Sequence, residues 1–173
     1  MAIKILGMVL ILFSTTMTGL YFSERYRYRT EDISSLKQAL VMLKNQILFL
    51  AMPLPEGMQD VSIRIGGSVG KFFETAAGLM EQRTSAGAEI IWEQAVLKNC
   101  GGTYFVGEDL DAIIGFGKSL GYLNQTQQEA SIDLLLTYLS DTEQQLLDKR
   151  AKNSRLYGSM GVLGGILMIV VLL

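Results

Sequence analysis

The sequence predicts an all-α protein: a helical bundle flanked by a transmembrane helix at each end. Three observations support this fold class. Through the middle of the 173-residue chain, apolar residues recur at three- and four-residue spacing, which places them on one face of a helix. No segment sustains the alternation of a strand, and the short stretch Thr103–Val106 is too isolated to form a sheet. Each end carries an uncharged run long enough to cross a bilayer.

The first uncharged run covers residues 5–23 and lies between Lys4 and Glu24. At 1.5 Å per residue it spans about 28 Å, close to the thickness of the hydrocarbon layer. The alternative is a cleaved signal peptide. Against it, no small-residue cleavage site precedes the charges, and three arginines follow that oppose translocation: Arg25, Arg27 and Arg29. We therefore predict an uncleaved N-terminal transmembrane helix over residues 1–24.

The second uncharged run covers residues 156–173, and its alternative is a buried core helix. Basic residues flank both runs on the side of the central region, while Lys4 is the one basic residue on the far side of the first run. The positive-inside rule then places residues 25–155 in the cytoplasm as a helical domain and both termini on the opposite face. The basic residues next to the second run are Lys149, Arg150, Lys152 and Arg155.

Small residues recur four positions apart in both predicted spans, as in Thr15/Gly19 and Gly161/Gly165. This spacing lets helix backbones approach closely, either between the two spans or with another subunit, including a second copy of the chain. The alternative is that glycine is simply common in membrane helices.

Six helices are predicted between Thr30 and the second span. Their approximate ranges are 31–51, 55–65, 68–82, 86–99, 107–120 and from 124 into the span. Pro53 ends the first helix, Pro55 suits the first position of the second, and Gly66-Gly67 ends it. Ser68 is the predicted N-cap of the third helix.

The predicted apolar faces provide the core of this domain. Their members are Ile33, Leu36, Leu40, Leu43, Ile47, Leu50, Met58, Val61, Ile63, Ile65, Val69, Phe72, Phe73, Ala76, Leu79, Met80, Ile90, Ile91, Trp92, Ala95, Leu97, Leu110, Ile113, Ile114, Phe116 and Leu120.

Composition removes several classes of function. The chain has no histidine and one cysteine, which excludes histidine acid–base catalysis, Cys–His nucleophiles and nearly every zinc site. Cys100 is predicted to be a small apolar filler. The net charge of −2 gives no indication of nucleic-acid binding. Residues 30–148 nevertheless hold 16 acidic and seven basic residues, which is either a solvated surface or a docking face for a basic partner.

The stretch GFGKSLG at residues 115–121 resembles a phosphate loop at Gly117-Lys118-Ser119. Such a loop needs a glycine separated by four residues from this triplet, and that position is Ala112. A phosphate loop also follows a buried strand, whereas the apolar residues of 107–120 have helical spacing. We therefore interpret the stretch as a helix end, with Gly121 as a left-handed stop and Lys118 solvated near the C-terminus of the helix. Gly115 and Gly117 are expected to let a neighbouring helix approach.

The next helix is predicted to begin with a capping box from Asn124 to Gln127.

The acidic residues Glu108, Asp109 and Asp111 are the strongest candidate metal ligands, but helix N-termini collect such residues in any case. Glu89 and Glu93 share one helical face without a third ligand nearby. No catalytic, cofactor-binding or metal-binding residue is predicted.

The order of several motifs resembles the stage III sporulation protein AB family (SpoIIIAB) of endospore-forming Firmicutes. These are an N-terminal span before arginines, AMPLPEGM after a long amphipathic helix, a helix with Trp92 and Ala95, LGYLNQTQQ, and a last span led by RLYGSMGVLGGIL. The sequence Tyr122-Leu123-Asn124 replaces part of the Ser/Asp-rich turn of typical members, while Gln127 keeps its place.

The resemblance implies a subunit of the channel-like complex that links mother cell and forespore. It also implies a cytoplasmic domain similar to the inner-membrane platform protein of type II secretion, which couples a cytoplasmic ATPase to the membrane assembly. The expected function is a non-enzymatic scaffold in the outer forespore membrane, with residues 25–155 in the mother-cell cytoplasm. Its expected partners are the other stage III subunits, including the ATPase, and membrane lipids. A membrane-anchored enzyme acting on lipid or nucleotide, or a pore-lining transport subunit, is the alternative.

Overall fold

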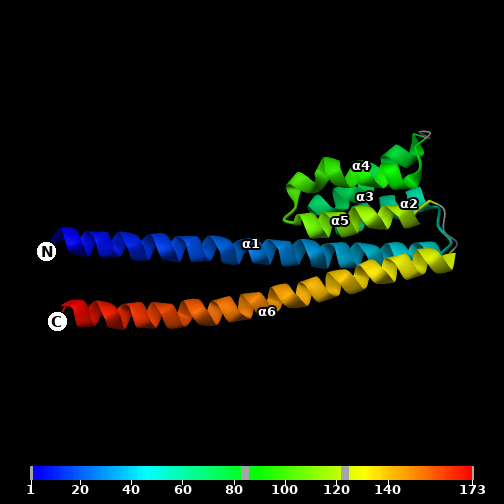
Figure 1. The fold of residues 1–173 in the computed structure, drawn as a ribbon. Helices are drawn as coiled ribbons and strands as arrows, with labels where there is room; N and C mark the ends of the chain where they lie inside the picture. The colour runs from blue at the N-terminus through cyan, green and yellow to red at the C-terminus, as the bar shows by residue number, and fades with distance from the viewer. Residues whose placement is uncertain (1, 83–85, 122–124, 173) are drawn as a thin grey trace. The chain divides into compact units, whose positions relative to one another are not determined.

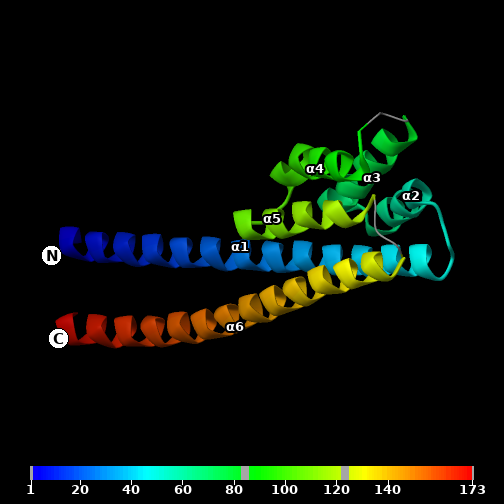
Figure 2. The ribbon, with the colours of Figure 1, turned by 45° about the vertical axis from the view of Figure 1, so that its right-hand side comes forward.

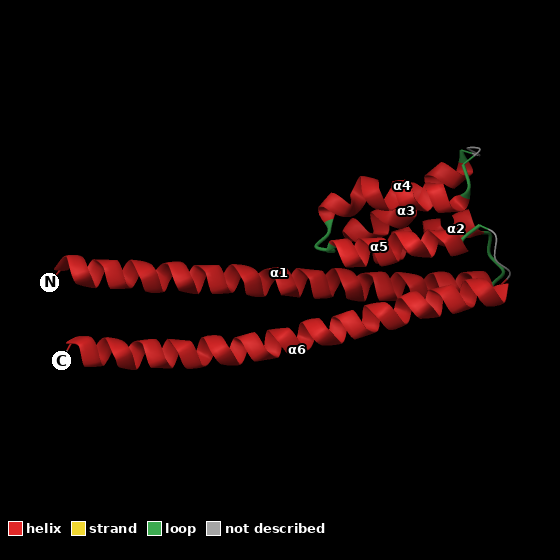
Figure 3. Cartoon of the chain, viewed as in Figure 1, coloured by secondary structure: helices red, strands yellow, loops and turns green. Residues whose placement is uncertain are grey.

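The computed structural model describes residues 2–82, 86–121 and 125–172, and the side chains of residues 24–82, 86–121 and 126–149. Within these ranges the chain forms six α-helices and two short 3-10 turns, with no strand (Figures 1 and 3). The elements are α1 (Ala2–Leu48), α2 (Leu54–Ile65), α3 (Gly67–Glu81), α4 (Ala88–Asn99), η1 (Cys100–Gly102), α5 (Gly107–Phe116), η2 (Gly117–Ser119) and α6 (Gln125–Leu172). The all-α prediction is confirmed.

The chain divides into two compact units. One comprises Met1–Tyr28 and Gln144–Leu173, which are the first part of α1 and the last part of α6. The other comprises Arg29–Glu143 and is called the helical body below. No helix in the described part of the chain has both the length and the apolar character to cross a membrane. The predicted spans, residues 5–23 and 156–173, have side chains outside the described set.

In the helical body, α1 and α6 run antiparallel and side by side, and α2 to α5 form a compact group beside α1 (Figures 1 and 2). Lys37 pairs with Glu143 and Lys44 with Asp133, which shows the opposite direction of the two long helices. Within the group, α2 packs on α3, α3 on α4, and α4 on both α5 and η2. The buried faces of these helices meet in one apolar core.

Trp92 lies at the centre of the aromatic part of this core and is fully buried. Its ring makes edge contacts with Phe73 and Phe116, with centroids 5.2 and 5.7 Å away. Its Nε1–H donates to the carbonyl of Ile113 at 2.7 Å, so the polar atom of the indole is satisfied inside the core. Through these contacts, the Trp92 side chain joins α4 to α3 and α5.

The predicted helix boundary at Gly66-Gly67 is confirmed, whereas the predicted N-cap Ser68 and the predicted left-handed stop at Gly121 are wrong. Gly66 and Gly67 have φ values of 62° and 58°, and α2 ends there as predicted. Ser68, however, lies inside α3, whose N-cap is Gly66. Gly121 does not adopt the left-handed conformation that was predicted for it. The predicted cap Asn124 lies outside the described residues.

The first long helix ends at Leu48, earlier than predicted. The chain then turns through Ala51, whose φ of 49° is left-handed, and the Met52 N–H donates back to the carbonyl of Gln46 at 3.0 Å. The helix end is thus closed before Pro53 is reached, and Leu50 lies beyond it with its side chain 66% exposed.

Most of the predicted core is buried, six of its members are half-buried, and four are exposed. Ile63 is 73% exposed because it lies two residues after buried Val61, on the other side of α2. The same offset of two residues turns Ile90 away from buried Trp92, and Leu97 away from buried Ala95, on α4. Leu50 is exposed because it lies beyond the end of its helix. Short helices contain too few turns for periodicity alone to identify the buried side.

Candidate functional site

The Gly-Lys-Ser triplet forms the 3-10 turn η2 directly after α5, so its interpretation as a helix end is confirmed. The Lys118 side chain is exposed, and the buried hydroxyl of Ser119 donates to the carbonyl of Phe116 at 2.7 Å. Gly117 packs against Trp92: a Cβ at this position would lie 2.7 Å from the indole Cδ1. The expected close approach therefore holds for Gly117 and not for Gly115, where a Cβ would meet nothing within 4 Å.

The acidic trio does not converge on one point. Glu108 and Asp111 are exposed, whereas Asp109 is fully buried. The Asp109 carboxylate accepts the N–H of Val106 at 2.9 Å, so it caps the first turn of α5. Among the described residues, no group of three potential ligands is arranged to hold a metal ion.

The principal partner of Asp109 is Arg29 of α1. Its guanidinium donates from Nε and Nη2 to the two carboxylate oxygens, each at 2.9 Å. Tyr138 of α6 adds its hydroxyl at 3.2 Å. Burial, followed by the nearby Asp109 charge, raises the pKa of Tyr138, which keeps the phenol protonated as a donor. One carboxylate thus joins α1, α5 and α6.

Sequence reasoning missed this network because it assigned Arg29 to a row of membrane-flanking arginines. The available indication was spacing: Arg25, Arg27 and Arg29 alternate by two residues and so leave a helix on different sides. The partner, Asp109, is 80 residues away, a separation on which local periodicity carries no information.

Lysines of α1 provide further links to α6. Lys37 Nζ lies 2.7 Å from Glu143, and Lys44 Nζ lies 2.7 Å from Asp133 and 3.1 Å from Glu129. Hydrogen bonds to Asp133 and Glu129 raise the pKa of Lys44. These pairs are partly exposed, so their contribution to stability is small.

The other residues that the sequence analysis considered, two glutamates of α4 and the single cysteine, do not form a site with one another. Glu93 is exposed and Glu89 is half-buried at the start of α4. Cys100 is only partly buried, and its thiol donates to the carbonyl of Leu97, so the prediction of a small apolar filler is wrong. The cause is its place in η1, after the end of α4, where the chain turns at the surface.

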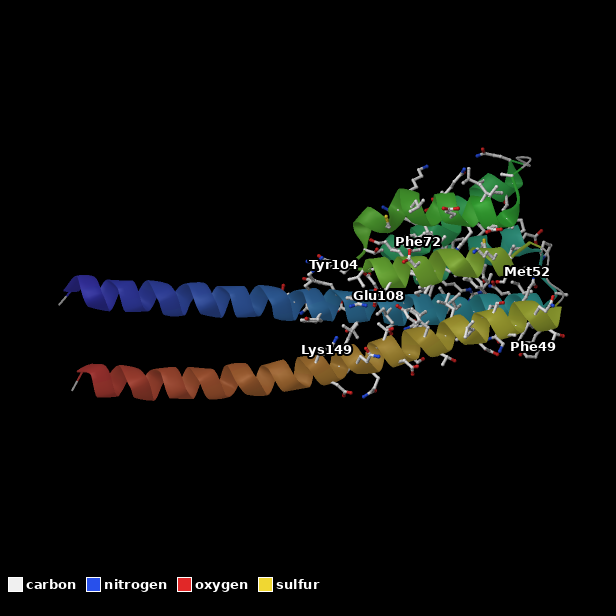
Figure 4. All side chains as sticks on the ribbon, in the orientation of Figure 1. Phe49, Met52, Phe72, Tyr104, Glu108 and Lys149 are labelled. Atoms are coloured by element: carbon white, nitrogen blue, oxygen red, sulfur yellow. The ribbon has the colours of Figure 1, made fainter. Side chains whose placement is uncertain are left out.

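Large apolar side chains are exposed on several elements of the helical body. On α4, Ile90 and Leu97 are about half-exposed and lie two turns apart on one face, with Glu93 and Gln94 between them. Phe49 and Leu50, after α1, are more exposed, and Figure 4 shows Phe49 and Met52 at this corner. Apolar surface of this kind is typical of protein contact sites.

The chain matches known proteins over nearly its full length. The model of the stage III sporulation protein AB family matches residues 4–173. Stage III sporulation protein AB of Bacillus subtilis (strain 168) is 29% identical over 171 residues, which cover 99% of both chains. A solved structure of stage III sporulation protein AB (SpoIIIAB) is similar in fold, with a TM-score of 0.68 at 23% identity, over 72% of this chain and 98% of that one. Helical architecture and a family match across residues 4–173 lead to the same conclusion: this chain belongs to the stage III sporulation protein AB family of sporulation proteins.

Proposed function

We propose that this protein is a non-enzymatic platform subunit of the stage III sporulation complex. Residues 5–23 and 156–173 anchor it in the outer forespore membrane, and its helical body docks the complex's ATPase and other subunits in the mother-cell cytoplasm. The family membership supports the sporulation role, and the uncharged runs with their flanking basic residues support the anchoring.

The observation that carries the docking role is the outward face of α4. Ile90 and Leu97 lie on this face with their side chains 49% and 53% exposed, although Trp92 on the opposite face is fully buried. We interpret the buried face of α4 as its contribution to the core and the face with Ile90 and Leu97 as the one offered to another protein. Glu93, exposed between the two apolar side chains, favours a partner with basic residues.

The use of Asp109 supports a scaffold rather than an enzyme. A buried carboxylate in a cleft is a common acid or base in catalysis. Here the carboxylate is held by Arg29, Tyr138 and the Val106 N–H, so its lone pairs are occupied by structural contacts.

Affinity purification of the full chain from detergent-solubilised membranes of sporulating cells tests the proposal. We expect the sporulation ATPase to co-purify, and Ile90→Ser with Leu97→Ser to reduce its recovery. Leu134→Ser, which changes a more exposed apolar residue on another helix, α6, serves as the control. If the purified chain itself hydrolyses nucleotide and loses this activity in Lys118→Ala, the scaffold proposal is wrong.

Residence in the membrane needs a separate measurement. We expect the full chain to resist extraction of sporulating-cell membranes at alkaline pH, while deletion of residues 156–173 and 1–24 together releases it. Release of the intact chain would refute the anchoring.

A further inference from the structure

A groove of about 460 Å³ lies at the corner where α1 turns into α2. One part of its wall is apolar and consists of Met42, Leu50 and Met52. The other is formed by one face of α2, where Glu56, Asp60 and Arg64 follow each other at four-residue spacing. Methionine side chains adapt to differently shaped apolar partners, which suits a binding surface.

The charged wall carries one unpaired negative charge. Arg64 donates to Asp60 at 2.8 Å, so these two charges compensate each other. Gln46 also donates its amide to Asp60. Glu56 is exposed and forms no ion pair with any residue that the structure describes. A single cationic group is therefore the charge complement of the groove.

A second polar atom of the groove also lacks a donor. Gln46 is 6% exposed, and its Oε1 has no hydrogen-bond partner among the described residues. A buried carbonyl oxygen without a donor destabilises the fold. Gln46 Oε1 is itself enclosed and faces Gly57, so the exposed carboxylate of Glu56 is the acceptor that an occupant can reach. An occupant that brings an N–H donor fits it better than one that brings a carboxylate.

The backbone is strained at the apolar side of the corner. Ala51 has a φ of 49°, a left-handed conformation that is unfavourable for an alanine. The strained turn leaves Phe49 78% and Leu50 66% exposed, instead of folding them onto the core. Strain and exposed apolar residues coincide where the groove opens, a combination that is frequent at binding sites.

We propose that this groove, residues 42–64 at the α1–α2 corner, docks a segment of another subunit that carries an apolar side chain next to a lysine or arginine. The apolar side chain contacts Met42, Leu50 and Met52, and the cation pairs with Glu56. The excess of acidic residues over residues 30–148 favours a basic partner over the acidic body of a second copy. This inference rests on the proposed scaffold function and adds a second contact surface, distinct from the face of α4.

The test places a photoreactive benzoylphenylalanine at position 50 of the full chain in sporulating cells, and sequences the crosslinked peptides by mass spectrometry. We expect a peptide of another subunit with an apolar residue beside a lysine or arginine. Glu56→Lys should lower the yield of this adduct about tenfold, as reversal of an interface charge does. Replacing the partner's basic residue with glutamate should restore the adduct in the Glu56→Lys chain.

Glu74→Lys is the matched control, because Glu74 is an exposed glutamate of α3 outside the groove and should leave the adduct unchanged. The buried Trp92 reports by its fluorescence whether each variant folds, and Glu56→Gln replaces Glu56→Lys if the latter does not. An adduct to a second copy, to lipid or to an acidic segment overturns the inference, as does an adduct that Glu56→Lys or Glu56→Gln leaves intact.

The inference and the platform proposal fail in different ways. If the ATPase co-purifies and crosslinks form at positions 90 or 97 but not at position 50, the groove proposal alone is wrong. If no stage III subunit is recovered with the chain at all, the platform proposal fails as well.

Discussion

Substitution of Arg29 by methionine removes the cation that pairs with Asp109, the most deeply buried charged group among the described residues of the helical body. Methionine keeps much of the length and apolar stem of arginine, so the change acts mainly on the guanidinium. It takes away two hydrogen bonds of 2.9 Å from Asp109, whose side chain is 0% exposed. The Asp109 carboxylate then keeps only the Val106 N–H and the Tyr138 hydroxyl.

Removing one partner of a buried ion pair typically costs about 3–5 kcal/mol of folding free energy. Arg29 is 18% exposed and two donors remain on Asp109, so we expect the lower end, about 3 kcal/mol. At about 2–4 °C per kcal/mol for a chain of this size, Tm should fall by about 6–12 °C. Arg64→Met, which breaks a surface pair at a side chain 62% exposed, should cost less than about 0.5 kcal/mol.

The assay is urea unfolding of the full chain in detergent, followed by the fluorescence of Trp92, the single tryptophan. A double-mutant cycle isolates the pair. Asp109→Asn keeps an oxygen for the Val106 N–H and removes the uncompensated charge, so Arg29→Met with Asp109→Asn should be about 1 kcal/mol more stable than Arg29→Met alone. The structural role of the Arg29–Asp109 pair would be refuted if the stability effects of Arg29→Met and Asp109→Asn were strictly additive. It would also be refuted if Arg29→Met cost no more stability than Arg64→Met.

Three further outcomes are expected. Gly117→Ala should destabilise the chain by about 1–3 kcal/mol and shift the fluorescence of Trp92, because the new Cβ would lie 2.7 Å from the indole; unchanged stability and spectrum would contradict the packing. Ala51→Gly should stabilise by about 0.5–1 kcal/mol, measured by urea midpoint, since glycine adopts the left-handed φ without strain. Burial raises the pKa of Asp32 above 3.8, so its stabilising contribution is full below that pH and is lost as the pH rises through the folded-state pKa. Asp32→Asn, which keeps an acceptor for the Tyr104 N–H, should flatten the fall in stability as the pH rises above 3.8, and an unchanged pH profile would contradict this assignment.

Local rules predicted the helices of the body but not their partners. The apolar spacing in residues 31–51 identified the buried side of α1, because Ile33, Leu36 and Leu40 repeat over several turns. The glycine pair 66–67 identified the break between α2 and α3, because a positive φ is a property of one residue and its type. Both features depend on a few neighbouring residues and are therefore visible in a sequence.

The errors concern features that depend on distant parts of the chain. Asp109 was interpreted as one of three acidic residues that favour a helix N-terminus, which explains its position but not its burial. Its burial depends on Arg29, which lies in another helix 80 residues earlier. The groove was also missed, since Met42 and Met52 become its wall only through the turn at Ala51. That turn has no glycine or asparagine to indicate it.

At the corner between α2 and α3, the residue type at position 66 is restricted by the handedness of the backbone and not by the space available for a side chain. Gly66 combines a φ of 62° with a ψ of −161°, and a Cβ built there would meet nothing within 4 Å. Reflected in a mirror, these angles become the polyproline II conformation, which most L-residues adopt readily. By its backbone angles, a chain assembled by chemical ligation should therefore favour D-alanine over L-alanine at position 66. Among the twenty encoded residues only the achiral one fits, although an L side chain would find open space there.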